Sequence, residues 1–419
     1  MKKYTLTAIA LAVACASQAH AAGYQLNEYS ITGLGRSFAG AGVVGDDYSA
    51  LAYNPAGMTL IKRSGFQGGL TVAEMMSDIK GNNGESTDMH YGVPLPSGFG
   101  QWNVNDKLFL GGGIYVPYGL STKHDQEGFV AGAARKSELE VIDSSVAGAY
   151  KISDKLSLGA TITLRYIHGH MTGDKYNPFI PSMKIADANY DLDGWTGSGI
   201  IGAMYEFTPD TRVGISYKFR SIQKVKGDFT YNSQVPSGTI LGRHPVYGPV
   251  YAPDSAVASD GLSSPDLPAS VLLSAYHKAT DKIGLSTSVR WTEWNKSFSS
   301  FTMESGFAGS SVTQQYDWRN TWTISAGADY YYNDNWTFRV GTAYDQSPAK
   351  SQYNRSNRIP DTNRIWLSAG LSYTSDNWQI DAGYAHLFMQ KGNIAMEDNI
   401  PAEYTSSANM YGINFQYKF

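Results

Sequence analysis

The sequence predicts an all-β fold, a 14-stranded antiparallel transmembrane β-barrel with an N-terminal hatch (plug) inside its lumen. Runs of alternating apolar and polar residues follow one another from residue 63 to the C-terminus. Six short polar turns beside aromatic residues alternate with seven long polar connections, an asymmetry typical of outer-membrane barrels. Charged residues make up only 17% of the chain, below the ~25% usual in soluble domains. Mean hydropathy is nevertheless −0.30, which fits a wall that is apolar on one face only.

Residues 1–21 are predicted to be a secretory signal peptide. Lys2 and Lys3 supply the positive start, residues 6–16 the apolar run, and Ala19-His20-Ala21 a small-x-small cleavage site. The apolar run is shorter than the ~20 residues that cross a bilayer. The only cysteine, Cys15, lies in this segment. Acylation of Cys15 as a lipoprotein is the alternative. Otherwise the mature chain has no disulfide and no cysteine metal site, and we expect no cofactor.

Residues 22–62 are predicted to form the hatch. They are rich in Gly, Ala and Ser, and they lack the two-residue alternation seen downstream. Side chains this small can pack as irregular backbone in a confined space. The segment closes on Asn54-Pro55-Ala56-Gly57, in which Pro fixes φ while Asn and Gly tolerate a tight turn.

Residues 63–419 are predicted to form the barrel wall. We expect strands of about 10 to 18 residues, which suffice because ~9–11 tilted residues span a membrane. An even strand number closes the barrel without an unpaired edge. The short turns are expected within 101–108, 150–156, 205–212, 276–282, 332–336 and 373–378, and the long connections near 76–91, 121–137, 172–190, 230–264, 297–313, 345–363 and 389–404.

The last strand shows the alternation most plainly. Tyr411, Ile413, Phe415, Tyr417 and Phe419 share one face, and the residues between them are small or polar. A final aromatic strand ending on Phe419 resembles the terminal signal read by barrel-assembly machinery, which is therefore an expected partner. A soluble β-sandwich is the alternative, because its strands also alternate.

Several stretches resemble the FadL family of outer-membrane transporters, which carry long-chain fatty acids and other hydrophobic compounds. In the hatch these are residues 22–28 (AGYQLNE), residues 33–40 (GLGRSFAG) and Asn54-Pro55-Ala56. Residues 331–339 (YYNDNWTFR) and 359–370 (IPDTNRIWLSAG) of the wall are similar to the same family. The resemblance spans the mature chain and implies a location in the bacterial outer membrane.

The resemblance implies passive, hatch-gated diffusion of a long-chain fatty acid, with lateral exit into outer-membrane lipid through a kinked third strand. A side exit keeps the acyl chain out of water, where it would lose ~0.8 kcal/mol per CH₂. Transport of aromatic or other neutral hydrocarbons by the same route is the alternative. A lipid-processing enzyme would need an activated nucleophile, and we find no Ser elbow motif. A porin would need an open lumen, which the hatch opposes. A net charge of −4 gives no basic footprint for nucleic acid, and we expect a monomer.

The predicted third strand, residues 108–120, contains Gly111-Gly112-Gly113 and Pro117. Gly marks bends in strands and Pro cannot donate a ladder hydrogen bond, so this strand is predicted to kink. In the family the lateral opening lies at the stretch matching Pro117-Tyr118-Gly119. The alternative is that Pro117 only begins an extracellular turn.

In the hatch, the resemblance assigns Asn54, Pro55 and Ala56 a gating or hatch-positioning role. Taken alone, the three residues predict only a turn. Tyr24 would be the third residue after cleavage and matches a Phe that reaches the ligand pocket in the family. Plain packing of the plug is the alternative for Tyr24, whose hydroxyl needs a partner when buried.

A carboxylate ligand needs a cation. Arg319 aligns with a basic residue that meets the fatty-acid headgroup in the family, and a guanidinium can clamp a carboxylate with two bonds. The alternative is a solvated arginine beside Asp317. The family's second basic headgroup position is Gly173 here, with Lys175 as the nearest substitute.

Phe179, Ile180 and Met183 lie in a predicted external loop and are assigned to first capture of the ligand, since exposed apolar side chains often mark a binding surface. Covering the loop's own short helix is the alternative. His168 and His170 share one strand face, but the sequence offers no further metal ligand, so a polar lumen or interface face is favoured.

Overall fold

The computed structural model describes residues 23–419 except 125–128, 131–134, 178, 181–182, 223–224, 247, 253, 264–265, 298–299, 305–310 and 397–399. The predicted signal peptide and Cys15 lie outside the described residues. Within the described ranges, no helix combines the length and apolar character needed to cross a membrane.

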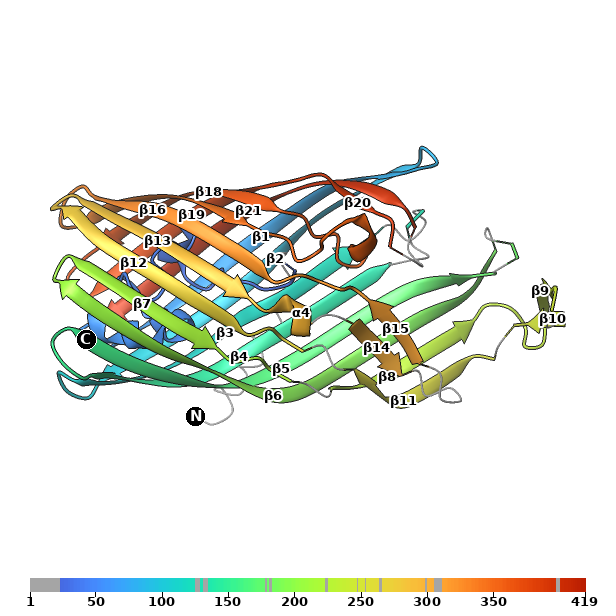
Figure 1. The fold of residues 1–419 in the computed structure, drawn as a ribbon, viewed down its shortest axis with the longest axis horizontal. Coiled ribbons are helices and arrows are strands. Elements are labelled where there is room, and N and C mark those ends of the chain that lie inside the picture. Colours follow the sequence, from blue (N-terminus) through green and yellow to red (C-terminus); the bar gives the residue numbers. More distant parts are fainter. Residues whose placement is uncertain are drawn as a thin grey trace.

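Fourteen antiparallel strands of the described chain form one closed barrel (Figure 1), which confirms the predicted strand number. Each strand pairs with the next around the ring, and the last strand pairs with the first along its whole length, so the wall closes on itself. In ring order the strands are β1 (Gly65–Gly81), β2 (Ser86–Asn103), β3 (Leu108–Lys123), β4 (Lys136–Lys151), β5 (Leu156–Tyr176), β6 (Lys184–Thr208), β7 (Thr211–Lys218), β12 (Ser270–Thr280), β13 (Ile283–Thr292), β16 (Thr321–Tyr331), β17 (Trp336–Asp345), β18 (Arg364–Thr374), β19 (Trp378–Met389) and β21 (Ala402–Lys418).

The six predicted short turns gather at one end of the barrel, together with the C-terminus, at the left of Figure 1. The long connections gather at the other end. The predicted connection over 76–91 is wrong, because β1 and β2 run through it and only residues 82–85 join them. Polar residues there suggested a loop, but these two strands continue into the outer end of the barrel (Figure 1), where a strand needs no apolar face. Strand lengths also vary more than expected, from 8 residues in β7 to 25 in β6.

The long connections carry structure of their own. Strand β8 (Val225–Ser233) pairs with the outer part of β6, and β11 (Ala256–Ser263) pairs with β8, so that both extend the wall. The other elements at this end are β9 (Ile240–His244), β10 (Gly248–Tyr251), α4 (Trp294–Ser297), β14 (Ser300–Glu304), β15 (Ser311–Gln315), η2 (Gln352–Asn354) and β20 (Gly392–Ile394).

The wall is apolar outside and polar inside, as the alternation predicts. On β21, Ile413 and Phe415 are exposed, whereas Asn414 and Gln416 between them are buried. Large exposed aromatics flank the short turns and form a belt at that end; they include Trp102, Tyr150, Tyr205, Phe207, Tyr332 and Trp336. Such belts lie at a membrane–water interface, where an amphipathic ring contacts both phases.

Residues 23–62 lie inside the barrel, where Figure 1 shows them as irregular coil with three short helical segments. These are α2 (Ile31–Leu34), α3 (Ala50–Tyr53) and η1 (Pro55–Leu60). The Ser30 hydroxyl caps α2 by accepting a hydrogen bond from the Gly33 amide at 2.9 Å. Nearly every residue of this segment, which we call the hatch, is buried against the wall.

Candidate functional site

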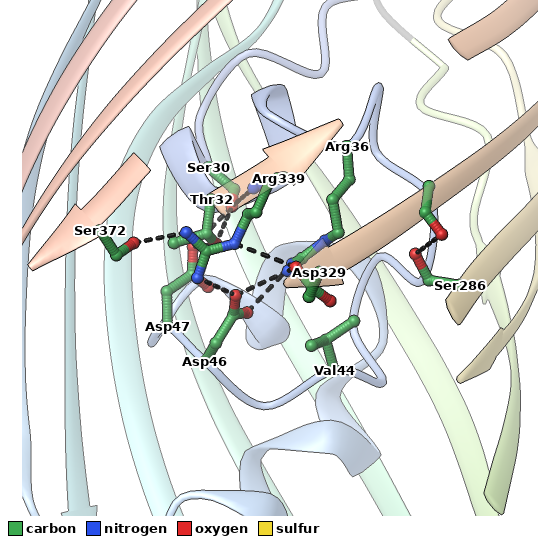
Figure 2. A network of polar contacts seen from close by, with 12 residues as sticks. Ser30, Thr32, Arg36, Val44, Asp46, Asp47, Ser286, Asp329, Arg339 and Ser372 are labelled. Atoms are coloured by element: carbon green, nitrogen blue, oxygen red, sulfur yellow. Dashed lines mark hydrogen bonds and ion pairs between the residues drawn. The ribbon is translucent and has the colours of Figure 1, made fainter. Parts of the chain in front are cut away.

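The body of the hatch is tied to the wall by an internal ion network (Figure 2). Arg36 of the hatch bridges Asp46, also in the hatch, and Asp329 on β16, with Nη1 2.8 Å from a carboxylate oxygen of each. Arg339 on β17 completes the network through contacts of 3.1 Å to Asp46 and 3.2 Å to Asp329. Burial alone would raise the pKa of Asp46, but Arg36 and Arg339 hold it well below its usual value. Two cations and two anions therefore compensate one another in the lumen.

A second anchor is formed by Asn54-Pro55-Ala56. The Asn54 side chain accepts a hydrogen bond from the Ala56 amide at 3.1 Å and donates to the Ala203 carbonyl of β6 at 3.1 Å. The backbone comes so close to the wall that a Cβ on Gly159 of β5 would lie 2.5 Å from the Ala56 nitrogen. The motif thus sits in a glycine-lined notch of the wall. The motif therefore contacts both β5 and β6.

Strand β3 has a register shift at the place where the sequence predicted a kink. Its pairing with β4 shifts register between Tyr115 and Tyr118, so that two residues, one of them Pro117, oppose one on β4. On its other edge, β3 pairs with β2 only from Phe109 to Ile114. Beyond Ile114 every residue from Tyr115 to Thr122 is buried, so this part of the strand has turned into the lumen with both faces covered. Pro117 therefore lies within the strand and begins no turn.

The glycines of β3 make room for neighbouring side chains. A Cβ on Gly111 would lie 2.7 Å from Cε of Met58 in the hatch, and one on Gly113 would collide with the Phe99 ring of β2. Gly112 is less crowded, since the nearest atom to its Cβ position is a backbone oxygen at 3.3 Å. The Gly triplet thus lies just before the register shift and fits the hatch against the strand.

The first residues of the hatch bond to the part of β3 that no longer pairs with β2. The Leu26 amide donates to the Pro117 carbonyl at 2.9 Å, and the Gly119 amide donates to the Tyr24 carbonyl at 2.9 Å. These bonds make Gln25 and Tyr118 an antiparallel pair. Residues 24–26 therefore act as a short replacement strand where the wall is interrupted.

An apolar cavity of about 50 Å³ lies beside this junction. Its lining includes Tyr24, Leu120, Leu139, Met171, Leu192 and Ile359. The Tyr24 ring also packs edge-on against Trp294, with ring centroids 4.8 Å apart. A volume of this size holds only a few heavy atoms, given ~10–15 Å³ for a single water. A long ligand would have to displace part of the lining.

A family model described as outer membrane protein transport protein (OMPP1/FadL/TodX) matches residues 12–419. The chain belongs to this family. A long-chain fatty acid transport protein from Escherichia coli O6:H1 is 30% identical over 449 residues, which cover 99% of each chain. The crystal structure of a Pseudomonas aeruginosa FadL homologue matches with a TM-score of 0.83 and 25% identity, covering 95% of this chain and 100% of that one. The Ralstonia pickettii toluene transporter TbuX shares the fold, with a TM-score of 0.67 and 18% identity over 93% of this chain and 98% of that chain.

Membership of the FadL family makes the chain a bacterial outer-membrane β-barrel. The family consists of transporters, so the prediction that the chain is no enzyme is confirmed. Its relatives handle hydrophobic compounds, which are fatty acids or monoaromatic hydrocarbons according to their names.

A cation that the sequence did not indicate, Arg358, lies at the apolar cavity of this FadL-family barrel. It lies in the β17–β18 connection and lines the cavity. Its Nη1 donates to the Ser137 hydroxyl at 2.8 Å, and among the described residues it has no ion-pair partner. Burial lowers the pKa of Arg358, as expected for a guanidinium without an acidic partner. Its Nη2 lies 3.3 Å from where a Cβ on Gly173 would stand. The guanidinium therefore occupies the space beside the glycine at which the family's second basic residue was expected.

Arg358 also marks a change from polar to apolar surroundings. Lys136 and Thr172, whose carbonyl oxygens accept hydrogen bonds from Arg358, line a second cavity of about 620 Å³. That cavity is polar and includes Lys123, His124 and Arg135. An amphipathic molecule would find polar groups on one side of Arg358 and apolar groups on the other.

Arg319 lies apart from the lining of the apolar cavity. Its side chain is partly buried, and its Nε donates to the Ser347 carbonyl at 3.0 Å. Asp317, two residues earlier, adopts a φ of +46°. Arg319 thus stands in the connection between β15 and β16.

Phe179, Ile180 and Met183 lie at the outer tip between β5 and β6. Phe179 and Ile180 are exposed, and Phe179 packs on Gly242 of β9. Met183 packs against a small cluster that contains Leu241. None of these side chains lines the apolar cavity, and two of them, Phe179 and Ile180, expose apolar surface in the β5–β6 connection. His168 and His170 belong to no group of three or more metal-ligating side chains among the described residues.

Proposed function

We propose that this barrel carries long-chain fatty acids across the outer membrane by passive diffusion that the hatch gates, with lateral exit at the kink of β3. The observation that carries the proposal is the replacement strand. Beyond Ile114 the edge of β3 is free of β2, and residues 24–26 bond to it instead. Displacing residues 24–26 would uncover this edge of β3. In an uninterrupted wall, all the hydrogen bonds between two strands would have to break to make an opening.

We propose that the ligand meets cations on its way in. The exposed Phe179 and Ile180, with the partly buried Met183, serve first capture, and Arg319 lies on the approach. Arg358 then holds the carboxylate at the boundary between the polar and apolar cavities. The apolar tail extends past Tyr24, which must yield because the cavity of about 50 Å³ is too small for the whole chain. Movement of Tyr24 would pull on the hatch residues bonded to β3, so ligand entry and exit are coupled.

We assign to Asn54, Pro55 and Ala56 the role of holding the hatch body in place, so that the lumen stays closed to water while the N-terminal residues move. Phe419 is exposed and lies against Phe66 with ring centroids 6.3 Å apart. We retain the proposal that barrel-assembly machinery reads this terminus and that the barrel acts as a monomer.

Neutral aromatic hydrocarbons are the second candidate ligands. The packing of Tyr24 against Trp294 and Trp318 offers ring surfaces on which an aromatic molecule could pack. A neutral ligand forms no ion pair with Arg319 or Arg358, so the two candidate ligand classes differ in whether they need a cation.

The test is uptake of oleate and of toluene in parallel, in cells that lack their own transporter and express this chain. We expect oleate uptake above the empty-vector level. Uptake of toluene without oleate would move the function to hydrocarbons while keeping the exit route. Uptake of neither, with normal amounts of folded protein at the surface, would overturn the proposed function.

A further inference from the structure

A second group of buried cations lies deeper in the lumen, and nothing described so far explains it. Lys218 is the last residue of β7, Arg165 lies on β5 and Arg290 on β13. All three side chains are buried, Arg165 completely. The charged groups close enough to act electrostatically on Lys218 are Arg165, Arg290 and a single acid, Asp143 of β4.

Asp143 is already engaged. It forms a bidentate pair with Arg165, with Nε–Oδ1 and Nη2–Oδ2 distances of 2.6 and 2.7 Å. Arg290 donates to the neutral amide of Asn27 in the hatch. The Lys218 ammonium has no hydrogen bond or ion pair with any described residue, and Nη1 of Arg165 is likewise without a hydrogen-bond partner. With Lys218 protonated, the group carries two more positive than negative charges.

An excess of buried positive charge is expensive. An ionised group taken out of water costs several kcal/mol unless a counter-charge and hydrogen bonds replace its hydration. The Lys218 ammonium lies 4.6 Å from the centroid of the Tyr118 ring. A cation–π contact supplies only ~0.5–2 kcal/mol and leaves the three ammonium donors unsatisfied. An anion at this point would supply the counter-charge and the hydrogen-bond acceptors that the described residues do not.

The position of the group identifies the anion. Tyr118, over which both Lys218 and Arg165 stand, is the residue of β3 that pairs with the hatch at the kink. Its ring lies 6.1 Å from that of Tyr24, which lines the apolar cavity. We infer that Lys218 and Arg165 form an inner site for the carboxylate of the transported acid, beside the kink and past Arg358. This inference rests on the proposed function, because only an acid ligand brings an anion to this depth.

The test replaces Lys218 by methionine, which keeps the length of the side chain and removes its charge. Uptake of oleate is compared with uptake of oleyl alcohol, which has the same chain and no carboxylate. Loss of one charge-assisted partner is expected to lower oleate uptake about tenfold. Oleyl alcohol uptake should stay at the wild-type level. Lys218→Arg should restore oleate uptake, because it restores the charge.

Lys155→Met is the matched control, since Lys155 is exposed in a short turn and its loss should change neither ligand. Unchanged oleate uptake by Lys218→Met, or an equal loss for oleate and oleyl alcohol, would overturn the inner site while leaving the proposed function intact. Failure of the wild-type protein to take up oleate would overturn both. Heat-dependent mobility on gels shows whether each variant is folded.

Discussion

At the scale of single residues, two arginines compete for the role of headgroup partner. Arg358 faces the apolar cavity without an ion-pair partner among the described residues, whereas Arg319 donates to a backbone carbonyl outside it. A hydrogen bond to a charged group contributes ~1.5–3 kcal/mol, so Arg358→Ala should weaken oleate binding tenfold or more. Arg319→Ala should weaken oleate less, though still more than it weakens toluene.

Binding can be followed by tryptophan fluorescence, because Trp294 and Trp318 pack on Tyr24 at the cavity. Equal loss of affinity for oleate and toluene in Arg319→Ala would exclude a headgroup role for Arg319. Unchanged oleate affinity in Arg358→Ala would exclude one for Arg358.

Glu28 makes the hatch sensitive to pH. Burial raises the pKa of its carboxyl from 4.5 to about 7, against the opposing influence of Arg364. A carboxyl whose folded-state pKa is raised stabilises the folded state while protonated, and this contribution is lost as the pH rises through about 7. Burial raises the pKa of Asp47 in the same direction, whereas Asp46 is held low by its arginines. The hatch should therefore open more readily at pH 8 than at pH 5.5.

Hydrogen exchange of residues 23–62, corrected for the intrinsic effect of pH, measures this opening. Between pH 5.5 and the raised pKa of Glu28, about 7, the lost stabilisation corresponds to roughly 2 kcal/mol. Glu28→Gln should remove most of the pH dependence. A hatch whose protection is the same at both pH values in the wild-type protein would contradict the expectation.

At the scale of elements, local sequence patterns predicted more of the fold than of the candidate site. The alternation and the short turns gave the strand number, and Gly111-Gly112-Gly113 with Pro117 placed the kink. Each of these signals lies within one strand or one turn. The connection over 76–91 failed because polar residues in a strand beyond the membrane look like a loop.

The cation sites could not be predicted, because their members come from distant strands. Arg358 meets the backbone beside Gly173 only when the β17–β18 connection folds over β5. Lys218 and Arg165 meet over the Tyr118 ring only because β3 turns into the lumen. The sequence around an arginine or lysine in an alternating strand does not indicate which residues of other strands it contacts. An alignment showing exchange of a basic residue between position 173 and position 358 would have been the signal.

The kink of β3 itself can be removed by deleting Pro117. The deletion leaves one residue between Tyr115 and Tyr118, which restores a regular register with β4 and keeps Tyr118 opposite Val141. It is cleaner than filling Gly111 or Gly113, whose side chains would strike Met58 and Phe99. We expect a folded barrel whose oleate uptake falls at least tenfold, because β3 can then rejoin β2.

Pro249→Val in β10 is the control for this deletion, since it removes a strand proline that lies opposite Arg243 of β9, away from β3. Uptake at the wild-type rate in the Pro117 deletion, with normal surface levels, would mean that the ligand does not leave through this strand.

At the scale of the whole molecule, the body of the hatch and its first residues contact different parts of the wall. The ion network ties it to β16 and β17, and Asn54 ties it to β6. Residues 24–26 instead contact the interrupted strand β3 on the side of the wall toward which the proposed exit opens. Release of ligand should therefore need movement of the first few hatch residues and no departure of the hatch body.

A disulfide between the hatch body and the wall tests this division of the hatch. Ser37 and Ser368 of β18 share a hydrogen bond with their hydroxyl oxygens 2.6 Å apart, so replacing both by cysteine places two thiols in contact. The predicted mature chain contains no other cysteine. The oxidised Ser37→Cys/Ser368→Cys protein should take up oleate at the rate of its reduced form and of Ser37→Cys alone. Loss of uptake on oxidation, restored by reductant, would show that the hatch body must itself leave its seat. The network of Arg36, Asp46, Asp329 and Arg339 would then be the latch that ligand binding has to break.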